Sequence, residues 1–312
     1  MHIRDSKTSI VIVNWNAGTQ LAEAVSSINA HHQDLVSSVI IVDNASTDDS
    51  LAQVEKLRHV AFDLQIVRNQ SNRGFAAACN QGAALARSEF ILFLNPDTRL
   101  FPDSLAKAIA FMLQPENAQI GICGIRLVDQ AGNTSLSAAR FPTLRVMAGT
   151  TLGLSRLFPA AFPPHLMNAS ELKETRRVDQ VIGAFFLIRR AVFERCGGFD
   201  ERFFVYFEEV DLSFRAHQLG YASCLLADVT AFHKLGGCSE KAKAARLFYS
   251  LRSRILYAQK HYSATELVVL VLLTGLELPL RLVQGVARVS WSDLRNTMSA
   301  YGNLVAYFVR RV

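Results

Sequence analysis

The sequence predicts an α/β fold in which a mostly parallel sheet carries helices on both faces. Short apolar segments alternate with helix-length segments through residues 1–125. Three of these apolar segments, 9–13, 39–42 and 90–94, contain almost no polar residue, which is typical of strands buried on both faces of a parallel sheet. The composition, 50% hydrophobic and 19% charged over 312 residues, suits one large domain or a mid-sized domain with an appended element. It excludes a disordered tail, a collagen-like chain and a small disulfide scaffold.

The predicted elements follow from hydrophobic pattern and capping signals, taken in chain order. Residues 9–13, 39–42, 64–67, 90–94 and 120–125 are predicted strands, and residues 19–30, 48–57, 76–86 and 104–113 are predicted helices. The four prolines at 142, 159, 163 and 164 predict a long irregular loop over 139–178. Beyond it we expect a strand at 181–188, a short helix at 190–196, a helix that opens at Glu208, a strand at 222–226 and a basic helix at 241–261.

The C-terminal region differs from the rest of the chain. The formal net charge is +6, and residues 246–312 account for all of it, with nine Lys and Arg against three acids. Residues 267–280 are the most apolar stretch, but they contain Glu277 and Pro279 and are shorter than the ~20 residues that a bilayer-spanning helix needs. We expect peripheral membrane contact through residues 264–295, in the manner of an interfacial helix. The alternative is a hydrophobic helix packed on the domain or on a second subunit.

Cysteine usage and the N-terminus bear on the compartment. The five cysteines are far apart and form no CxxC pair, which favours a reducing cytosol and argues against a zinc site. The polar start MHIRDSKTS runs directly into the first predicted strand, so no signal peptide is expected.

Polar residues follow three predicted strands at the edge where open parallel sheets bind ligands. They are Asn14-Trp15-Asn16, Asp43-Asn44 and Asn95-Pro96-Asp97, each of which alone is also explained as a turn. Asp43 is placed to accept hydrogen bonds from a base or a ribose, and Asp97 to hold Mg²⁺ or Mn²⁺. Neither GxGxxG nor GxxxxGK[ST] occurs, which argues against a dehydrogenase and a P-loop NTPase.

Two further groups are candidates for chemistry. Glu208, Glu209 and Asp211 place three acids within four residues in an aromatic setting, either as a general base or as acids that complement a helix dipole. His233 is predicted to lie in a loop after a strand, where a histidine is either structural or a ligand.

Several motifs, taken together and in order, resemble the family 2 glycosyltransferases of the GT-A fold, and among them the rhamnosyltransferase-type members of bacterial surface polysaccharide synthesis. The segments are SIVIVNWN, IIVDNASTD, NRGFAAACNQG, FLNPD, GAFFLIRR, GGFDERFFVYFEEVDLSFRA and HKLGG, and the resemblance covers about residues 8–262. It implies a doubly wound mixed sheet flanked by helices, with a C-terminal hydrophobic and basic helical extension. It also implies a glycosyltransferase domain at 1–245, with a nucleotide-binding half to about 125 and an acceptor-binding half from about 126, followed by a membrane-associating extension at 246–312.

The resemblance also implies roles for individual residues. Glu209 would be the catalytic base, with Glu208 in reserve and Asp211 orienting the acceptor or the helix. Asp97 and His233 would hold Mg²⁺ or Mn²⁺. The nucleotide sugar would contact Asn14, Asp43, Asn72, Gly74, Asn80 and Asn95. Two positions depart from the family pattern: Asn95 stands where many relatives have an acid, and Glu209 stands where Asp is usual.

The expected function is inverting transfer of a sugar from a nucleotide diphosphate to a lipid-linked or polysaccharide acceptor, at the cytoplasmic face of the cell membrane. Among donors, dTDP-rhamnose is favoured, with UDP-hexoses and GDP-mannose open. A non-catalytic binding protein of the same fold is the alternative from another class. A nucleotidyltransferase would need a Gly-rich basic loop after the first strand, which Asn14–Gly18 does not provide. We expect no nucleic-acid partner, since the basic excess lacks interleaved aromatics, and a homo-oligomer is left open.

Overall fold

A computed structural model of the chain describes residues 7–57, 59–234 and 243–310, which form two compact units. The first unit comprises the described residues up to Arg140, Leu166–Glu201 and the described residues from Glu208 to Lys234. The second comprises Phe141–His165, Arg202–Phe207 and the described residues from Lys243 onward. Two segments that we predicted to be part of the transferase domain, 141–165 and 202–207, therefore belong to the second unit.

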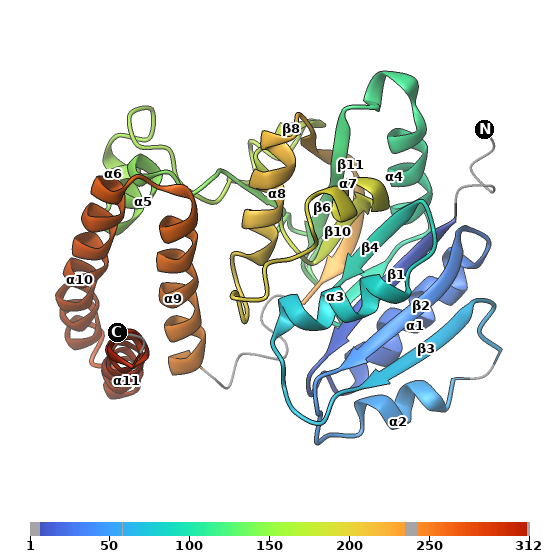
Figure 1. Cartoon of the computed structure of the whole chain (residues 1–312), viewed down its shortest axis with the longest axis horizontal. Coiled ribbons are helices and arrows are strands. Elements are labelled where there is room, and N and C mark those ends of the chain that lie inside the picture. Colours follow the sequence, from blue (N-terminus) through green and yellow to red (C-terminus); the bar gives the residue numbers. More distant parts are fainter. Residues whose placement is uncertain (1–6, 58, 235–242, 311–312) are drawn as a thin grey trace. The chain divides into compact units, whose positions relative to one another are not determined.

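The first unit is built on a mixed sheet (Figure 1). Strands β1, β2, β3 and β4 are mutually parallel, β10 runs antiparallel between β4 and β6, and β11 pairs with β6 in parallel and with β5 and β8 in antiparallel fashion. The order is β3-β2-β1-β4-β10-β6-β11-β5. The strands are β1 Thr8–Asn14, β2 Val36–Asp43, β3 Asp63–Arg68, β4 Phe90–Leu94, β5 Thr98–Leu100, β6 Ile120–Val128, β8 Arg176–Val178, β10 Phe185–Arg189 and β11 Ala222–His233. A separate pair joins β7 (Ala138–Ala139) to β9 (Gln180–Val181).

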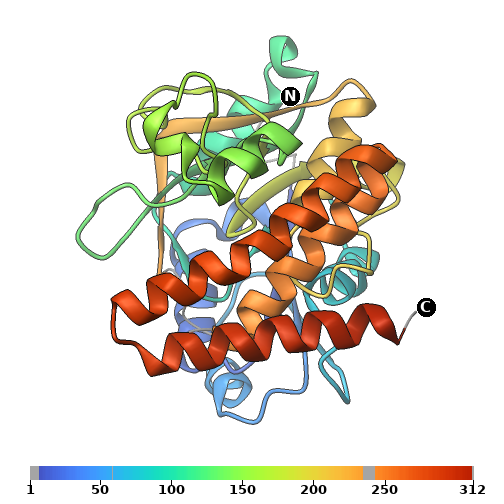
Figure 2. The ribbon, with the colours of Figure 1, turned by 90° about the vertical axis from the view of Figure 1, so that its left-hand side faces the viewer.

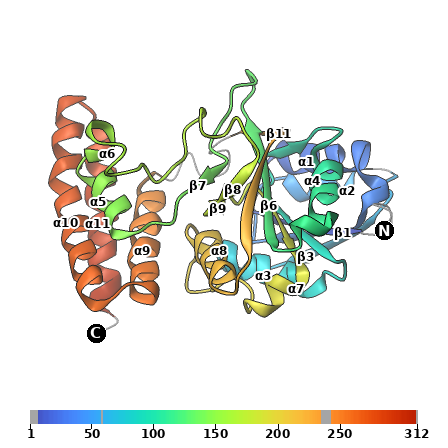
Figure 3. The same ribbon diagram turned by 90° about the horizontal axis from the view of Figure 1, so that it is seen from above.

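Helices cover both faces of this sheet, as the apolar strands predict (Figure 3). Helices α1 (Thr19–His31), α2 (Ser50–Glu55) and α4 (Ser104–Leu113) bury their apolar sides against one face. Helices α3 (Phe75–Leu85), α7 (Arg190–Arg195) and α8 (Glu208–Gln218) bury theirs against the other. On that second face Phe93 of β4 lies with its ring centroid 4.9–6.4 Å from those of Phe186, Phe193 and Phe199. The doubly wound arrangement predicted from the sequence is confirmed.

The structure corrects three predictions. The strand predicted at 222–226 continues to His233 through an irregularity between Leu226 and Thr230, so His233 lies at a strand end and not in a loop. The strand predicted at 181–188 is divided into β9 and β10 by a turn. The region 139–178 contains helices α5 (Leu144–Thr151) and α6 (Leu154–Leu157), because Thr143 caps the first of them through its side chain and Met147 is buried.

The second unit contains three long helices that lie side by side, α9 (Lys243–His261), α10 (Ala264–Ala287) and α11 (Trp291–Val309) (Figure 2). A capping box between Ser263 and Glu266 begins α10, which continues through Pro279 and so exceeds the predicted 267–280. The Glu277 carboxylate of α10 pairs with Arg254 of α9, at 2.8 Å, and with Arg281 of its own helix. None of the helices in the described part of the chain combines the length and the apolar character that crossing a membrane requires.

The segment Arg202–Phe207 packs on α9 within the second unit. The rings of Phe204 and Tyr249 stack with centroids 4.6 Å apart, and the buried Ser253 hydroxyl donates to the Val205 carbonyl at 2.9 Å. Its last two residues, Tyr206 and Phe207, have φ of 68° and 70°, a region that bulky residues rarely adopt. The chain therefore passes through a strained backbone immediately before Glu208.

Candidate functional site

The ends of β1 and β2 hold a buried polar network. Strand pairing sets Asn14 opposite Asp43, and the Asn14 amide donates to the Asp43 carboxylate at 2.7 Å and to the Ser50 hydroxyl at 2.8 Å. The second oxygen of Asp43 accepts from the backbone N–H of Ser46 at 3.1 Å. Since β1 also pairs in parallel with β4, Asn95 follows the neighbouring strand at the same edge of the sheet. The structure thus brings Asn14, Asp43 and Asn95 to one edge.

Asn44, which the sequence analysis placed at this edge without a role, connects it to the loop after β3. It is 2% exposed, its amide donates to the Gly74 carbonyl at 3.0 Å, and its side-chain oxygen accepts from Asn69 at 2.9 Å. Asn72 accepts from the Gly74 N–H at 2.9 Å, and Gly74, with φ of 88°, precedes α3 in a conformation that favours glycine. The loop carrying Asn72 and Gly74 is therefore held against the β2 end, and the backbone at Gly74 has no side chain to keep a ligand away.

Asp97 and His233 meet because β5 pairs with the end of β11. Thr98 lies opposite His233 in this antiparallel pair, and the Lys234 N–H donates to the Asp97 carbonyl at 3.1 Å. The Asp97 Oδ1 and His233 Nε2 atoms are 3.4 Å apart, and both residues are buried. His233 Nδ1 is a buried atom with no hydrogen-bond partner among the described residues.

These two residues fit a divalent cation that is shared with a substrate. In the described part of the chain, no group of three or more His, Cys, Asp or Glu residues is arranged to hold a metal ion. Asp97 and His233 would therefore supply two ligands, and a bound diphosphate and water would have to supply the rest. Mg²⁺ is commonly held in this way, by one or two carboxylates together with substrate phosphates. Asn95 offers an amide where a second carboxylate would stand, so Asp97 would be the charged ligand of the pair.

Glu208 and Glu209 begin α8 and carry the most unusual carboxylates of the site. Glu208 is 5% exposed and Glu209 is half-buried, and the Oε2 atom of each has no hydrogen-bond partner within the described structure. Burial raises the pKa of Glu208 well above its usual value, and the negative charge of Glu209 raises it further. Burial also raises the pKa of Glu209. Carboxyl groups with unused oxygens and raised pKa values are suited to accept a proton near neutral pH.

The turn between β9 and β10 connects the base candidates to the Asn95 segment. A Cβ at Gly183 would lie 3.9 Å from the Glu209 Cγ atom, and the Asn95 N–H donates to the next carbonyl, that of Ala184, at 3.1 Å. Cys79 of α3 also lies close, since burial and the charges of Glu208 and Glu209 raise the pKa of its thiol. Glu209 thus lies beside a turn that is bonded to the carboxyl end of β4.

Two predicted site residues make contacts that hold local structure together. Asp211 is 0% exposed and pairs with Arg215 at 2.7 Å, and Arg215 in turn donates to the Gly198 carbonyl at 2.8 Å. The Asn80 amide both donates to the Phe199 carbonyl at 2.8 Å and accepts from the Phe199 N–H at 2.9 Å. Asp211 therefore orients α8, one of its two predicted roles, while Asn80 holds the loop before α8 and is not joined to the strand-end network by any contact in the described structure.

Comparisons with known proteins identify similar glycosyltransferases. A sequence-family model described as "Glycosyl transferase family 2" matches residues 9–197. The N-acetylglucosaminyl-diphospho-decaprenol L-rhamnosyltransferase of Mycobacterium tuberculosis is 25% identical over 271 residues, which cover 81% of this chain and 84% of that protein. The rhamnosyltransferase WbbL of Escherichia coli is 27% identical over 234 residues, or 72% of this chain and 81% of that protein.

Among solved structures, the mannosyltransferase PcManGT of Pyrobaculum calidifontis, in complex with GDP-Man and Mn²⁺, superposes with a TM-score of 0.59 at 16% identity. The similarity covers 96% of this chain and 87% of that one, and it shows a shared GT-A fold. Because the family model spans more than half of the sequence, the assignment does not depend on any single motif. The chain belongs to glycosyl transferase family 2.

Proposed function

We propose that this protein is an inverting glycosyltransferase that moves a sugar, with dTDP-rhamnose the favoured donor, onto a lipid-linked or polysaccharide acceptor at the inner face of the cell membrane. The observation that carries the proposal is the pair Glu208, buried, and Glu209, half-buried, with unused oxygens and raised pKa values, of which Glu209 lies beside the turn bonded to Asn95. The names of two relatives support rhamnose as the sugar, and one of them names a diphospho-decaprenol acceptor.

In the proposed reaction the acceptor hydroxyl attacks the anomeric carbon of the donor as the bond to the diphosphate breaks. Glu209 removes the hydroxyl proton, while Glu208, whose pKa is raised further, stays the reserve candidate for the base. Asn14, Asp43 and the Asn72–Gly74 loop bind the nucleotide. A divalent cation bound by Asp97 and His233 would offset charge on the departing diphosphate. A single displacement inverts the anomeric centre without a covalent enzyme intermediate.

The donor can be identified by measuring thermal stability with dTDP-rhamnose, UDP-glucose or GDP-mannose, each with and without Mn²⁺. A donor present at one hundred times its Kd stabilises the protein by about 2.7 kcal/mol, which raises Tm measurably. We expect the largest shift with dTDP-rhamnose and Mn²⁺. A larger shift with GDP-mannose, the donor named for the Pyrobaculum structure, would change the donor but keep the enzyme class.

Slow donor hydrolysis without acceptor distinguishes the enzyme from a binding protein of the same fold. We expect hydrolysis with Mn²⁺, and transfer to a lipid-linked acceptor with inverted anomeric configuration, read by NMR of the product. Donor binding without hydrolysis or transfer would favour the non-catalytic alternative.

A further inference from the structure

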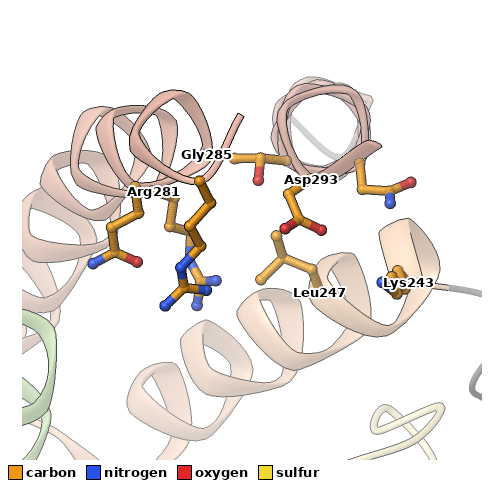
Figure 4. Close-up of a pocket in the computed structure, with 9 residues that line it drawn as sticks. Lys243, Leu247, Arg281, Gly285 and Asp293 are labelled. Carbon is orange, nitrogen blue, oxygen red and sulfur yellow. The ribbon is translucent and has the colours of Figure 1, made fainter. Parts of the chain in front are cut away.

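The second unit contains a basic pocket that the sugar transfer does not use. It has a volume of about 270 Å³ and is lined from all three long helices, by Lys243 of α9, Arg281 of α10, Arg288 directly after α10, and Asp293 of α11 among others. Figure 4 shows Lys243, Arg281 and Asp293 around the same space. Three cations thus face one carboxylate. Like charges gathered in this way repel one another unless an anion lies between them.

One of these cations is fixed in place before any ligand arrives. The Arg281 Nε atom donates to Glu277 at 2.7 Å, and Arg254 donates to the other oxygen of Glu277 at 2.8 Å. Although burial opposes it, the two guanidinium groups lower the pKa of Glu277, which therefore stays ionised and holds Arg281 at neutral pH. Arg288 and Lys243 are exposed at the pocket wall, so the side chains that face it carry an excess of positive charge.

The size and polarity of the pocket indicate a phosphate group. Guanidinium groups bind phosphate through paired hydrogen bonds, and the side-chain amides of Gln284 and Asn296 add further donors. The volume lies just below the ~300–1,000 Å³ that sites for whole small molecules usually have. A nucleotide sugar is therefore too large for it, whereas a phosphate headgroup is not.

The end of this pocket carries an exposed apolar tip, formed by Val286, Val289 and Trp291, which are 65%, 81% and 81% exposed. Val289 has φ of 51°, a region in which a β-branched residue is an outlier. The next residue, Ser290, donates its N–H to the Gly285 carbonyl at 3.0 Å and accepts from the Asp293 N–H at 3.3 Å. Because Gly285 and Asp293 both line the pocket, the tip and the pocket form one local structure.

We propose that the pocket between α9, α10 and α11 binds the phosphate headgroup of an anionic membrane lipid, while Val289 and Trp291 enter the apolar layer. Exposed tryptophan at a membrane interface beside clustered arginine is the combination that anionic bilayers attract. The charge excess of residues 246–312 complements such a surface. This inference rests on the membrane contact of the proposed function and narrows it from residues 264–295 to the turn between α10 and α11.

The test is co-sedimentation of the full-length protein with vesicles of phosphatidylcholine, with or without phosphatidylglycerol. We expect the protein to bind only vesicles that contain phosphatidylglycerol. One basic residue near such a surface contributes about 1 kcal/mol, or roughly a fivefold change, so Arg288→Gln should bind at least fivefold more weakly. Trp291→Ser should lose binding. Arg295→Gln is the matched control, since Arg295 is an exposed arginine of α11 that does not line the pocket. Its binding should fall less than twofold.

Three results would overturn the proposal. Equal losses for Arg288→Gln and Arg295→Gln would mean diffuse charge attraction without a pocket. Equal binding to both vesicle types would remove the role of the headgroup. Stabilisation by inorganic phosphate without any vesicle binding would assign the pocket to a free phosphate. Donor-induced thermal shifts are measured on the same variants and should not change, so a failure of this proposal is separable from a failure of the proposed sugar transfer.

Discussion

Replacing Glu209 with Gln tests the proposed base with little structural disturbance. The substitution keeps the shape of the side chain and changes an oxygen that has no hydrogen-bond partner in the described structure, if the new amide nitrogen occupies the Oε2 position. A positioned general base contributes about 10²–10⁴-fold, so we expect kcat to fall by that factor, equivalent to about 3–5 kcal/mol of barrier height. The donor Kd should stay within about twofold. The residues proposed to bind the nucleotide, Asn14 and Asp43, lie at the ends of β1 and β2, and Glu209 lies on α8. Steady-state kinetics with a donor titration measure both quantities.

Glu208→Gln is the matched control for charge. If Glu209 is the base, Glu208→Gln retains more activity than Glu209→Gln, because it leaves the carboxylate that accepts the proton in place. Wild-type activity should fall as pH decreases through the raised pKa of the base. The reasoning is refuted if Glu209→Gln keeps more than a tenth of the wild-type kcat while Glu208→Gln abolishes it.

The raised pKa of Glu208 also affects stability. A carboxyl group that binds its proton more tightly in the folded than in the unfolded protein costs stability as pH rises above about 4.5, by about 1.4 kcal/mol for each unit of pKa difference. Chemical denaturation should therefore show Glu208→Gln to be more stable than wild type at pH 8, with the difference disappearing toward pH 4. A constant difference across this range would argue against the buried carboxylate as its cause.

Other parts of the site give further predictions. Asp97→Asn and His233→Gln should each remove the Mn²⁺-dependent part of the donor thermal shift and leave the Mn²⁺-independent part; an unchanged Mn²⁺ response in both would exclude this cation site. Asp43→Asn should weaken donor binding roughly tenfold or more by calorimetry, since hydrogen bonds to charged groups contribute about 1.5–3 kcal/mol. Asn80→Ala should lower the free energy of unfolding by about 1–3 kcal/mol without changing donor Kd, because it leaves the Phe199 backbone groups unpaired; altered donor affinity at full stability would return Asn80 to the binding site.

The sequence was most informative where strands are buried on both faces. β1 and β4 are continuous apolar runs with polar residues directly after them, so both the sheet and the edge at Asn14 and Asn95 could be predicted. β5 could not, because it has three residues and, in the described part of the chain, pairs only with β11. That pairing brings His233 to Asp97. The irregularity after Leu226 interrupts the strand pattern, so the sequence did not predict that β11 reaches His233. Motif resemblance likewise could not reveal that the Asn80 amide is hydrogen-bonded to the backbone of Phe199.

The stacking of Phe204 on Tyr249 and the bond from Ser253 to Val205 have a practical consequence. The residues that hold the backbone leading into Glu208 come about fifty positions later in the chain, in α9. Shortening the protein from its C-terminus to improve yield would thus sacrifice this support as soon as the cut reaches α9. A shortened protein that keeps donor affinity but turns over slowly would have lost the packing of the Arg202–Phe207 segment, and its slow turnover would say little about lipids.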